Sequence, residues 1–383
     1  MQKVNKIFFL GPSVLIGTVV GAGIFGLPYV VSRSGIVPGL FYFLILGGAV
    51  LLIHLFFGEV ILRTEGKCRL PGLVQKYLGK KEKILTGVSV IVGITGALLA
   101  YIILAGDFLK ILFSSLGNFS SFQLAFVFWI VLSFFIFRGI KTIAPAEIFT
   151  NILFFLVIFV IIGFCLPKFD LSNFALINPS ASIFLPYGVI LFSLIGWSAI
   201  PEMIEIFKTP EEKKNTKKVI ILSTIIILFL YFCFIMAVLG VSGKVTSFDT
   251  LSGLLPFLGE KIIFFGALAG VITLADSFLV LGLYLRNTFI YDLKFSKNLS
   301  FLISCGVPFL LYFLGLRSFI TTIGFVGTII GAIEGIIIIL IFKKAKILGE
   351  RTPEYSLNIP SFLLYFLILI LILGAISQIY FYL

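Results

Sequence analysis

Long apolar runs separated by short polar gaps make up most of this sequence of 383 residues. A helix that crosses a bilayer needs about 20 apolar residues, and its backbone groups must pair within the segment. The runs are too long and continuous for barrel strands, so the pattern predicts an all-α polytopic membrane protein. Eleven transmembrane helices are expected at residues 7–31, 37–62, 84–113, 122–138, 145–166, 183–206, 218–241, 261–291, 299–315, 318–342 and 360–382.

Composition excludes most other classes of protein. Hydrophobic residues make up 60% of the chain and charged residues 12%, with a mean hydropathy of +1.19. A soluble domain carries about 25% charged residues. The longest polar gaps are 63–83, 207–217 and 343–359, which leave no room for a soluble domain. We therefore expect one transmembrane domain over residues 1–383.

The distribution of charge indicates the partner and the orientation. The net charge is +12, but the basic residues lie in the gaps between apolar runs and do not form one face. The lipid bilayer is therefore the expected partner, and nucleic acid is not. With the N-terminus inside and the spans alternating, 23 of the 29 Lys and Arg residues fall on the inner side. This excess predicts a plasma membrane protein with its N-terminus in the cytoplasm and its C-terminus outside.

Neither the N-terminus nor the cysteines change this interpretation. Lys3 and Lys6 precede an apolar run that continues to Val31 without a cleavage site of small residues. We interpret this run as a retained first helix and not as a signal peptide. The four cysteines show no spacing typical of a disulfide framework or a metal site, and no cofactor is expected.

Two spans, five apart, contain helix breakers. The first contains Gly21, Gly23 and Gly26, and the sixth contains Gly196-Trp197-Ser198 followed by Pro201. Interrupted helices at matching positions of two halves are typical of transporters with inverted repeats and a midplane binding site. The predicted architecture is a five-plus-five inverted repeat, with helices 1 and 6 broken and one extra helix. The expected segments are about 7–166 for the first repeat, about 183–342 for the second and about 360–382 for the extra helix.

The glycines of the first span have two other interpretations. Gly17 and Gly21 have the spacing of a close helix-packing face. Residues 21–26 also match the dinucleotide fingerprint G-x-G-x-x-G. That match fails on context, because no strand precedes it and no acidic residue follows about 20 residues later.

Several stretches resemble a known family. GAGIFGLPY, followed by Pro38-Gly39, resembles the opening of amino acid permeases. Residues 57–80 and the stretch LFSLIGWSAIPEM are similar to bacterial members of the amino acid/auxin permease family, within the amino acid–polyamine–organocation superfamily. The resemblance implies the inverted-repeat fold of the bacterial leucine transporter. It also implies amino acid transport driven by Na⁺ or H⁺.

The glycine-rich break suits an amino acid ligand. Unwinding at residues 21–24 frees backbone N–H groups at a half-helix N-terminus, which suits a carboxylate. The carbonyl groups before this break and those near residues 195–198 suit the ammonium. A leucine at Gly21 or Gly23 would then fill the ligand's space and stop uptake with the fold intact. Together with the roles that the resemblance implies on spans 3 and 6, the candidate substrate-binding residues are Gly21, Ala22, Gly23, Ile24, Tyr101, Phe192, Ile195, Gly196, Trp197 and Ser198.

These roles have alternatives. Tyr101 and Phe192 serve equally well as packing residues in a chain with 45 Phe and 13 Tyr. The aromatic-rich pocket and the resemblance favour a large neutral or aromatic amino acid. Trp197 is placed in the side-chain pocket, so its replacement by alanine is expected to change substrate selectivity.

Ionisable residues within spans are costly and are functional candidates by default. Glu59 and Arg286 lie near the inner ends of spans 2 and 8, where they are candidates to pair or to gate. Asp107 in span 3 and Glu334 in span 10 are further gating or proton candidates. His54, the single histidine, is either a satisfied donor between helices or a proton relay.

The resemblance implies a cation site between spans 1 and 8. Its coupling-cation candidates are Gly17, Val20, Thr273, Asp276 and Ser277. Asp276 departs from the family pattern, which has a hydroxyl there. Its carboxylate would bind Na⁺ or take up a proton in its place, or it would fix packing by facing Arg286 or a span 1 amide. We favour cation coupling, with Na⁺ and H⁺ both open.

The sequence therefore predicts a secondary active amino acid transporter that works by alternating access. A polytopic membrane sensor or enzyme is the alternative. No nucleophile with a base and no paired metal ligands support catalysis. An ion channel is disfavoured, because broken helices around a midplane cavity suit an occluded site better than a continuous pore.

Overall fold

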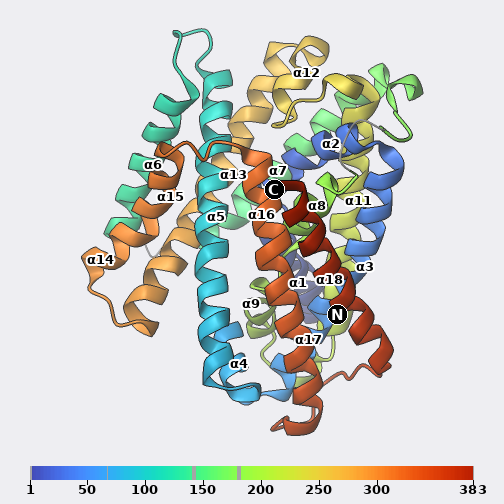
Figure 1. Cartoon of the computed structure of the whole chain (residues 1–383), viewed down its shortest axis with the longest axis vertical. Coiled ribbons are helices and arrows are strands. Elements are labelled where there is room, and N and C mark those ends of the chain that lie inside the picture. Colours follow the sequence, from blue (N-terminus) through green and yellow to red (C-terminus); the bar gives the residue numbers. More distant parts are fainter. Residues whose placement is uncertain (1, 67, 140–143, 179–182, 383) are drawn as a thin grey trace.

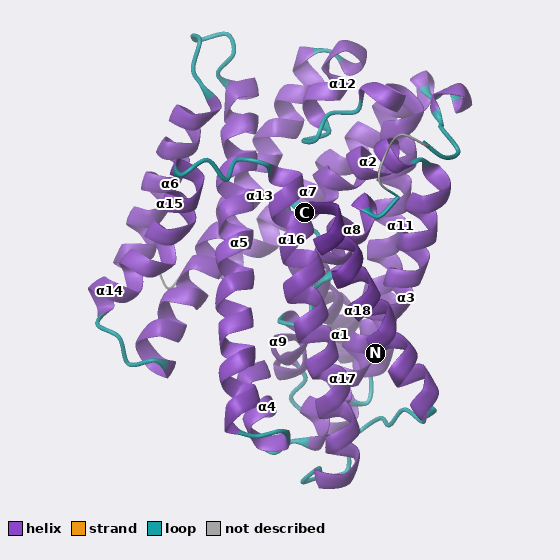
Figure 2. Ribbon diagram, viewed as in Figure 1, coloured by secondary structure: helices purple, strands orange, loops and turns teal. Residues whose placement is uncertain are grey.

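A computed structural model of the chain describes residues 2–66, 68–139, 144–178 and 183–382 (Figure 1). Within these ranges every regular element is a helix (Figure 2). The side chains of Lys3 and Lys6 fall outside the described side chains.

The expected spans appear in the described chain as helices or helix pairs, mostly within a few residues of their predicted ends. They are α1 (Gln2–Val19) with α2 (Gly23–Ser34), α3 (Ile36–Arg63), α5 (Lys80–Leu112), α6 (Ser121–Arg138), α7 (Ala144–Cys165), α8 (Leu185–Leu194) with α9 (Ala199–Ile206), α11 (Thr216–Ser242), α13 (Glu260–Asn287), α14 (Lys297–Phe301) with α15 (Val307–Phe313), α16 (Phe319–Phe325) with α17 (Gly331–Leu348), and α18 (Ser361–Tyr382).

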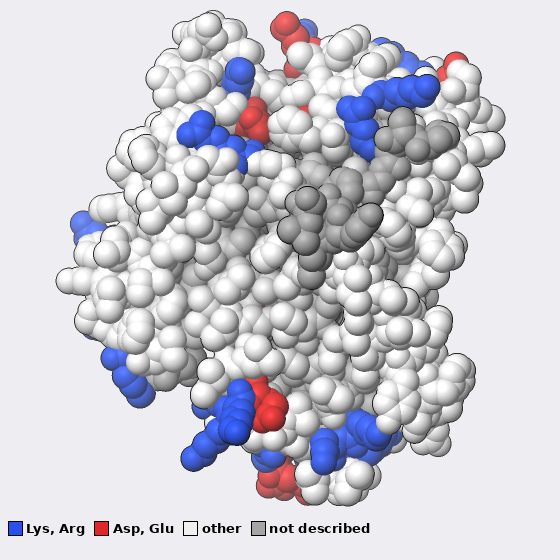
Figure 3. Space-filling view, viewed as in Figure 1, with Lys and Arg blue, Asp and Glu red and all other residues white. Residues whose placement is uncertain are grey.

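Length and apolarity agree with a membrane protein. Among the described residues, eight helical stretches are long and apolar enough to cross a bilayer, and the pair α1–α2 makes a ninth. Residues 152–168 and 297–313 form shorter apolar helices. Charged side chains gather at the two ends of the molecule, and the middle of the visible face is nearly free of them (Figure 3). Exposed Phe, Leu and Ile side chains on α6, α7 and α18 fit a lipid-facing surface.

Both predicted interruptions are present. The first span bends by 54° between α1 and α2, and residues 195–198 separate α8 from α9. The two broken spans pack on each other, because α2 lies against α8 and α1 against α9. The inverted-repeat architecture with broken helices 1 and 6 is therefore confirmed.

Short elements that the apolar pattern did not predict lie between the spans or within them. Three of them are short α-helices, α4 (Leu70–Tyr77), α10 (Pro210–Lys213) and α12 (Leu251–Leu258). The remaining ones are 3₁₀ turns at η1 (Leu166–Lys168), η2 (Leu171–Asn173) and η3 (Gly243–Val245), and π-helical turns at η4 (Thr288–Asp292), η5 (Leu302–Gly306) and η6 (Val326–Ile330).

The π-turn η6 has a packing reason. It continues α16 into α17 within the tenth span and lies against α8. A Cβ at Gly327 would stand 2.0 Å from the carbonyl oxygen of Gly188, so the two backbones approach too closely for any side chain at this position. This contact fixes the second broken span on the tenth span. π-turns often mark such functional positions.

Candidate functional site

The first break, at residues 20–22, interrupts the backbone hydrogen bonding of the helix. The N–H of Val20 donates to Ile16 at 2.8 Å, and the N–H of Gly21 donates to Val19 at 3.0 Å. Beyond the break, Phe25 donates to Ala22 at 3.2 Å. The N–H groups of Ala22 and Gly23 have no backbone partner within the described residues. Two free N–H groups at the start of α2 match the predicted seat for a carboxylate.

The second break lies directly beside the first. Ile195 has an extended backbone, with φ −62° and ψ 125°, and the helix resumes where Ala199 donates to Gly196 at 3.0 Å. A Cβ at Gly196 would stand 2.2 Å from a methyl carbon of Val19, the last residue of α1. Only glycine permits this approach. The two breaks therefore form one site.

The glycines of the first break have different surroundings. A Cβ at Gly21 would meet nothing within 4 Å, whereas a Cβ at Gly23 would stand 2.5 Å from Ser193 Oγ and 2.8 Å from Ser193 Cα. Open space therefore lies beside Gly21 and not beside Gly23. The prediction that leucine at Gly23 would spare the fold is wrong, because that position packs on the backbone of α8.

The remaining candidates on the sixth span point to different neighbours. The side chain of Ile195 lies against Gly331 of α17, and Phe192 lies against Gly327 of η6. Phe192 is half-buried, and Ser198 is exposed. Thr18, on the first span near its break, is also exposed. Open space therefore adjoins both breaks.

The Trp197 side chain makes a hydrogen bond that the sequence did not indicate. Its indole N–H donates to Glu334 Oε2 on α17 at 2.6 Å, and Ser89 of α5 lies 3.5 Å from the other carboxylate oxygen. Both Trp197 and Glu334 are buried. A role of Trp197 in the substrate pocket stays a prediction, but the indole N–H is already paired with the tenth span.

His54 lies on the other side of this tryptophan. The two rings meet edge to face, with centroids 6.4 Å apart. Both ring nitrogens are buried and have no hydrogen-bond partner in the described part of the chain. The interpretation of His54 as a satisfied donor between helices is therefore wrong. A proton relay through this ring stays a prediction.

Tyr231 is a residue of the site that sequence reasoning missed. It lies on α11 and is buried, and its hydroxyl reaches the carbonyl oxygens of Val19 at 2.9 Å and Ser193 at 3.0 Å. One of 13 tyrosines inside an apolar run carries no sequence signal that would single it out.

The candidates on spans 3 and 8 lie together. The Tyr101 hydroxyl lies within hydrogen-bonding reach of the Ser277 side chain. One turn before Ser277, the Thr273 hydroxyl is buried without a partner among the described residues. Asp276 is half-buried beside them. Since α13 packs chiefly on α5, α7, α6 and α12, and α1 on α11 and α9, the cation site with Gly17 and Val20 stays a prediction.

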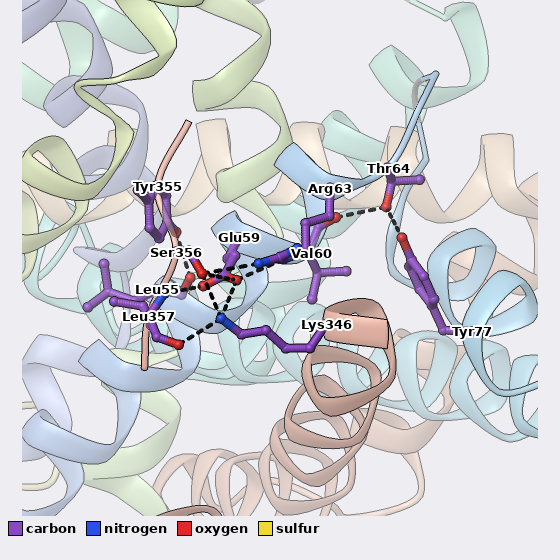
Figure 4. A network of polar contacts seen from close by, with 10 residues as sticks. All are labelled: Leu55, Glu59, Val60, Arg63, Thr64, Tyr77, Lys346, Tyr355, Ser356 and Leu357. Atoms are coloured by element: carbon purple, nitrogen blue, oxygen red, sulfur yellow. Dashed lines mark hydrogen bonds and ion pairs between the residues drawn. The ribbon is translucent and has the colours of Figure 1, made fainter. Parts of the chain in front are cut away.

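Glu59 belongs to a different cluster from the one expected. Its carboxylate is fully buried and pairs with Arg63 at 2.8 Å and Lys346 at 2.7 Å (Figure 4). It also accepts hydrogen bonds from the N–H of Leu357 at 2.7 Å and the hydroxyl of Ser356 at 3.3 Å. We call these five residues the Glu59 hub. It joins α3, α17 and the segment 349–360.

A pair of Glu59 with Arg286 is therefore ruled out. Arg286 donates instead to the carbonyl oxygen of Ile136 at 2.9 Å, which ties α13 to α6. Both residues lie near the C-terminal ends of their helices, and each contacts nearer neighbours. The basic partners of Glu59 are Arg63 on its own helix and Lys346 on the tenth span.

A second contact holds the segment 349–360 on the surface. Lys76 of α4 donates to Glu350 at 2.5 Å, and the N–H of Glu65 donates to the same oxygen at 2.8 Å. The hydrogen bond from Lys76 lowers the pKa of Glu350, and the same bond raises the pKa of Lys76. Burial raises the pKa of Tyr355 well above its usual range, and its hydroxyl donates to Leu55 at 2.6 Å.

The last candidate, Asp107, lines a cavity at the C-terminal end of α5. This cavity of 840 Å³ lies between α5, α6, α12 and α13 and is also lined by Lys110, Ser121, Asp249 and Lys261. Asp107 interacts with the Ser121 side chain at the start of α6. Asp249, just before α12, accepts from the Ser252 hydroxyl at 2.6 Å and from the Ser252 N–H at 3.3 Å. Among the described residues, no group of three or more His, Cys, Asp or Glu side chains is placed to hold a metal ion.

Two broken helices laid against each other, with bare backbone at each break, define the class of secondary transporters built from inverted repeats. A solved structure agrees on the fold: the crystal structure of MhsT in complex with L-phenylalanine matches with a TM-score of 0.68 at 15% identity, over 96% of this chain and 98% of that one.

The family follows from the sequence as a whole. The model of the tryptophan/tyrosine permease family matches residues 4–378, and the chain belongs to this family. A relative named glutamine transporter 2, from Aliivibrio fischeri, is 24% identical over 328 residues, which cover 83% of this chain and 84% of the relative. The chain is thus a multi-pass membrane protein and an amino acid transporter, which confirms the predicted function and the resemblance to amino acid permeases.

Proposed function

We propose that this chain is a secondary active transporter that moves an amino acid across the plasma membrane by alternating access, coupled to Na⁺ or H⁺. The observation that carries the proposal is the contact between the two breaks, with open space beside Gly21. The N–H groups of Ala22 and Gly23 would bind the substrate carboxylate. Carbonyl groups that precede the two breaks would bind the ammonium.

The substrate side chain would lie along the sixth span. Phe192 and Ile195 line this span beside η6 and α17 and offer an apolar wall. Tyr101 would close the site from span 3. A large neutral or aromatic amino acid fits such a wall, and the family description and the phenylalanine complex of MhsT support it. The relative named for glutamine keeps a polar side chain among the candidates.

The coupling cation would bind between spans 1 and 8. The buried, unpartnered hydroxyl of Thr273 supports a polar ligand there, within the part of the chain that the structure describes, and Ser277 lies one turn away. Gly17 and Val20 would add carbonyl groups, and Asp276 would add a carboxylate. Hard oxygen donors of this kind suit Na⁺, and the carboxylate is also able to carry a proton.

Orientation and organisation complete the proposal. The N-terminus would be cytoplasmic and the C-terminus outside, as the basic residues at the inner ends of the spans indicate. The repeats would cover about 7–166 and about 183–342, followed by the extra helix at about 360–382. Membership of the bacterial amino acid/auxin permeases, within the amino acid–polyamine–organocation superfamily, is the narrower assignment that we propose.

Reconstituted protein tests the proposal. A thermal-shift screen of the twenty amino acids, with and without Na⁺, identifies ligands by the stabilisation that binding confers. Counterflow of the labelled ligand in proteoliposomes then measures exchange. We expect at least one amino acid to stabilise the protein and to be exchanged. Stabilisation without exchange would indicate a sensor. The absence of both stabilisation and exchange would refute the proposal.

A pair of glycine variants locates the site. Gly21 and Gly48 both have open space where a Cβ would stand, but Gly48 is exposed on the outer surface of α3. We expect Gly21→Leu to abolish counterflow and Gly48→Leu to leave it unchanged, with both variants folded. Normal exchange by Gly21→Leu would place the substrate elsewhere.

A further inference from the structure

One hydroxyl group connects the two broken helices. Tyr231 of α11 is fully buried, and its hydroxyl lies 2.9 Å from the carbonyl oxygen of Val19 and 3.0 Å from that of Ser193. Val19 is the last residue of α1, and Ser193 lies in the last turn of α8. A single side chain from a third helix thus contacts the ends of both half-helices.

Both carbonyl groups need this partner because the helices are broken. In a continuous helix each would accept from the N–H four residues later, but the breaks remove those donors. Within the described part of the chain, the N–H of Gly21, at 3.0 Å, is the only backbone donor to the Val19 carbonyl. A buried carbonyl group without a donor is rarely tolerated. Tyr231 supplies the missing donor to both, and its one hydrogen is shared between two acceptors.

The partial charges at the ends of α1 and α8 give the Tyr231 contact an electrostatic role in addition to packing. The C-terminal end of a helix carries a partial negative charge, and here two such ends face one spot. Left alone, the ends of α1 and α8 would repel each other. The hydroxyl hydrogen lies between them and holds them together. Glycine contacts fix the flanking positions, because Gly196 touches Val19 and Gly23 touches Ser193.

We propose that Tyr231 is a positioning residue for substrate binding: its hydroxyl ties the first break to the second and sets the spacing of the carbonyl groups that receive the substrate's ammonium. This inference rests on the proposed function. It assigns Tyr231 no direct contact with substrate. Without the tie, the two breaks shift relative to each other, and small shifts of binding groups cost affinity.

The test is Tyr231→Phe, which keeps the ring and removes only the hydroxyl. The matched control is Tyr187→Phe, because the Tyr187 hydroxyl also bonds a carbonyl group, that of Ile370 in α18 at 3.3 Å, away from the breaks. Counterflow in proteoliposomes is measured with labelled phenylalanine, tryptophan, tyrosine and glutamine. The readouts are KM, the maximal rate per folded protein, and the thermal midpoint.

We expect Tyr231→Phe to raise KM about tenfold, as for the loss of one well-placed hydrogen bond, with a maximal rate within about twofold of wild type. Tyr187→Phe should leave KM unchanged. An unchanged KM in Tyr231→Phe would overturn the inference. Equal losses of folded protein in both variants, without a change of KM, would show a purely structural bond and also overturn it.

Two further outcomes are informative. A lower KM in Tyr231→Phe would show that the hydroxyl competes with the ammonium for the two carbonyl groups, which contradicts a positioning role. If wild-type protein exchanges none of the twenty amino acids, the proposed function itself fails. In contrast, if wild type exchanges substrate and Tyr231→Phe has the same KM, only the inference about Tyr231 fails.

Discussion

Glu59→Gln is the sharpest test of how the Glu59 hub stabilises its end of the molecule. The substituted amide would keep the shape of the side chain but lose the charge that faces Arg63 at 2.8 Å and Lys346 at 2.7 Å. The Glu59 side chain is 0% exposed, whereas those of Arg63 and Lys346 are 15% and 27% exposed. The substitution therefore leaves two largely buried cations without their counter-ion.

The size of the effect follows from this burial. Removing one partner of a buried ion pair costs about 3–5 kcal/mol, because the other charge is left unpaired. Here the two cations are partly exposed, so water recovers part of that loss. We expect Glu59→Gln to lower the free energy of unfolding by about 2–4 kcal/mol. The segment 349–360 should detach first, since Leu357 and Ser356 also donate to this carboxylate.

The assay is reversible unfolding in mixed detergent micelles, followed by tryptophan fluorescence. Glu202→Gln is the matched control at the same end. Its pair with Arg69, at 3.2 Å, joins side chains that are 52% and 43% exposed. An exposed pair contributes about 0–1 kcal/mol. If both variants lose the same free energy, the Glu59 hub does not stabilise the fold as argued. A second variant, Lys346→Met, should lose less when combined with Glu59→Gln than when alone.

Three further predictions concern the site and its surroundings. Gly23→Ala should lower the thermal midpoint and the yield of folded protein because its Cβ would meet the backbone of α8, whereas Gly21→Ala should not; equal midpoints would contradict the packing. Asp276→Asn should lose accumulation driven by an imposed Na⁺ or proton gradient, and full accumulation under both gradients would exclude Asp276 as the coupling residue. The lowered pKa of Glu350 means that its contact with Lys76 stabilises the segment 349–360 above about pH 4.3. This stabilisation is lost as the pH falls through the pKa of Glu350 in the folded protein. The raised pKa of Lys76 preserves the contact up to about pH 10.4 and beyond. Amide exchange of this segment, corrected for intrinsic rates, should therefore stay constant from about pH 5 to pH 9 and rise in acid, and Lys76→Ala should remove the acid transition.

Most of the fold was predictable from the apolar pattern. A run of about 20 apolar residues has few alternatives to a membrane helix, and the glycines and Pro201 marked both breaks. The π-turns were not predictable, because residues 326–330 have the composition of an ordinary helix. The geometry of η6 comes from contact with α8, where Gly327 meets Gly188. Such a contact joins residues that lie far apart in the sequence.

The candidate site, like the fold, was predictable from the sequence only in part. Spacing within one span placed Gly21 and Gly196 at the breaks, but it could not tell which glycine faces open space and which faces α8. Apart from Arg63 on the same helix, the partners of Glu59 come from α17 and the segment 349–360, about 290 residues later in the chain. Judged from the sequence alone, Arg286 was an equally good candidate partner for Glu59, because both residues were predicted at a similar depth in the membrane. Only the arrangement of the helices around each carboxylate decides between them.

The contacts of the second break suggest how substrate binding reaches other spans. Residues 195–198 touch the tenth span twice, through the indole of Trp197 on Glu334 and through Ile195 on Gly331. The same break touches the end of α1 through Gly196, and Tyr231 ties Ser193 to Val19. A ligand that alters the spacing of the two breaks must therefore strain the Trp197–Glu334 hydrogen bond or move α17 with it. The other end of α17 carries Lys346, which is held by Glu59 on α3. α17 thus contacts the second break at one end and the Glu59 hub at the other, so a variant that loosens the Glu59 hub should also change how the breaks respond to substrate.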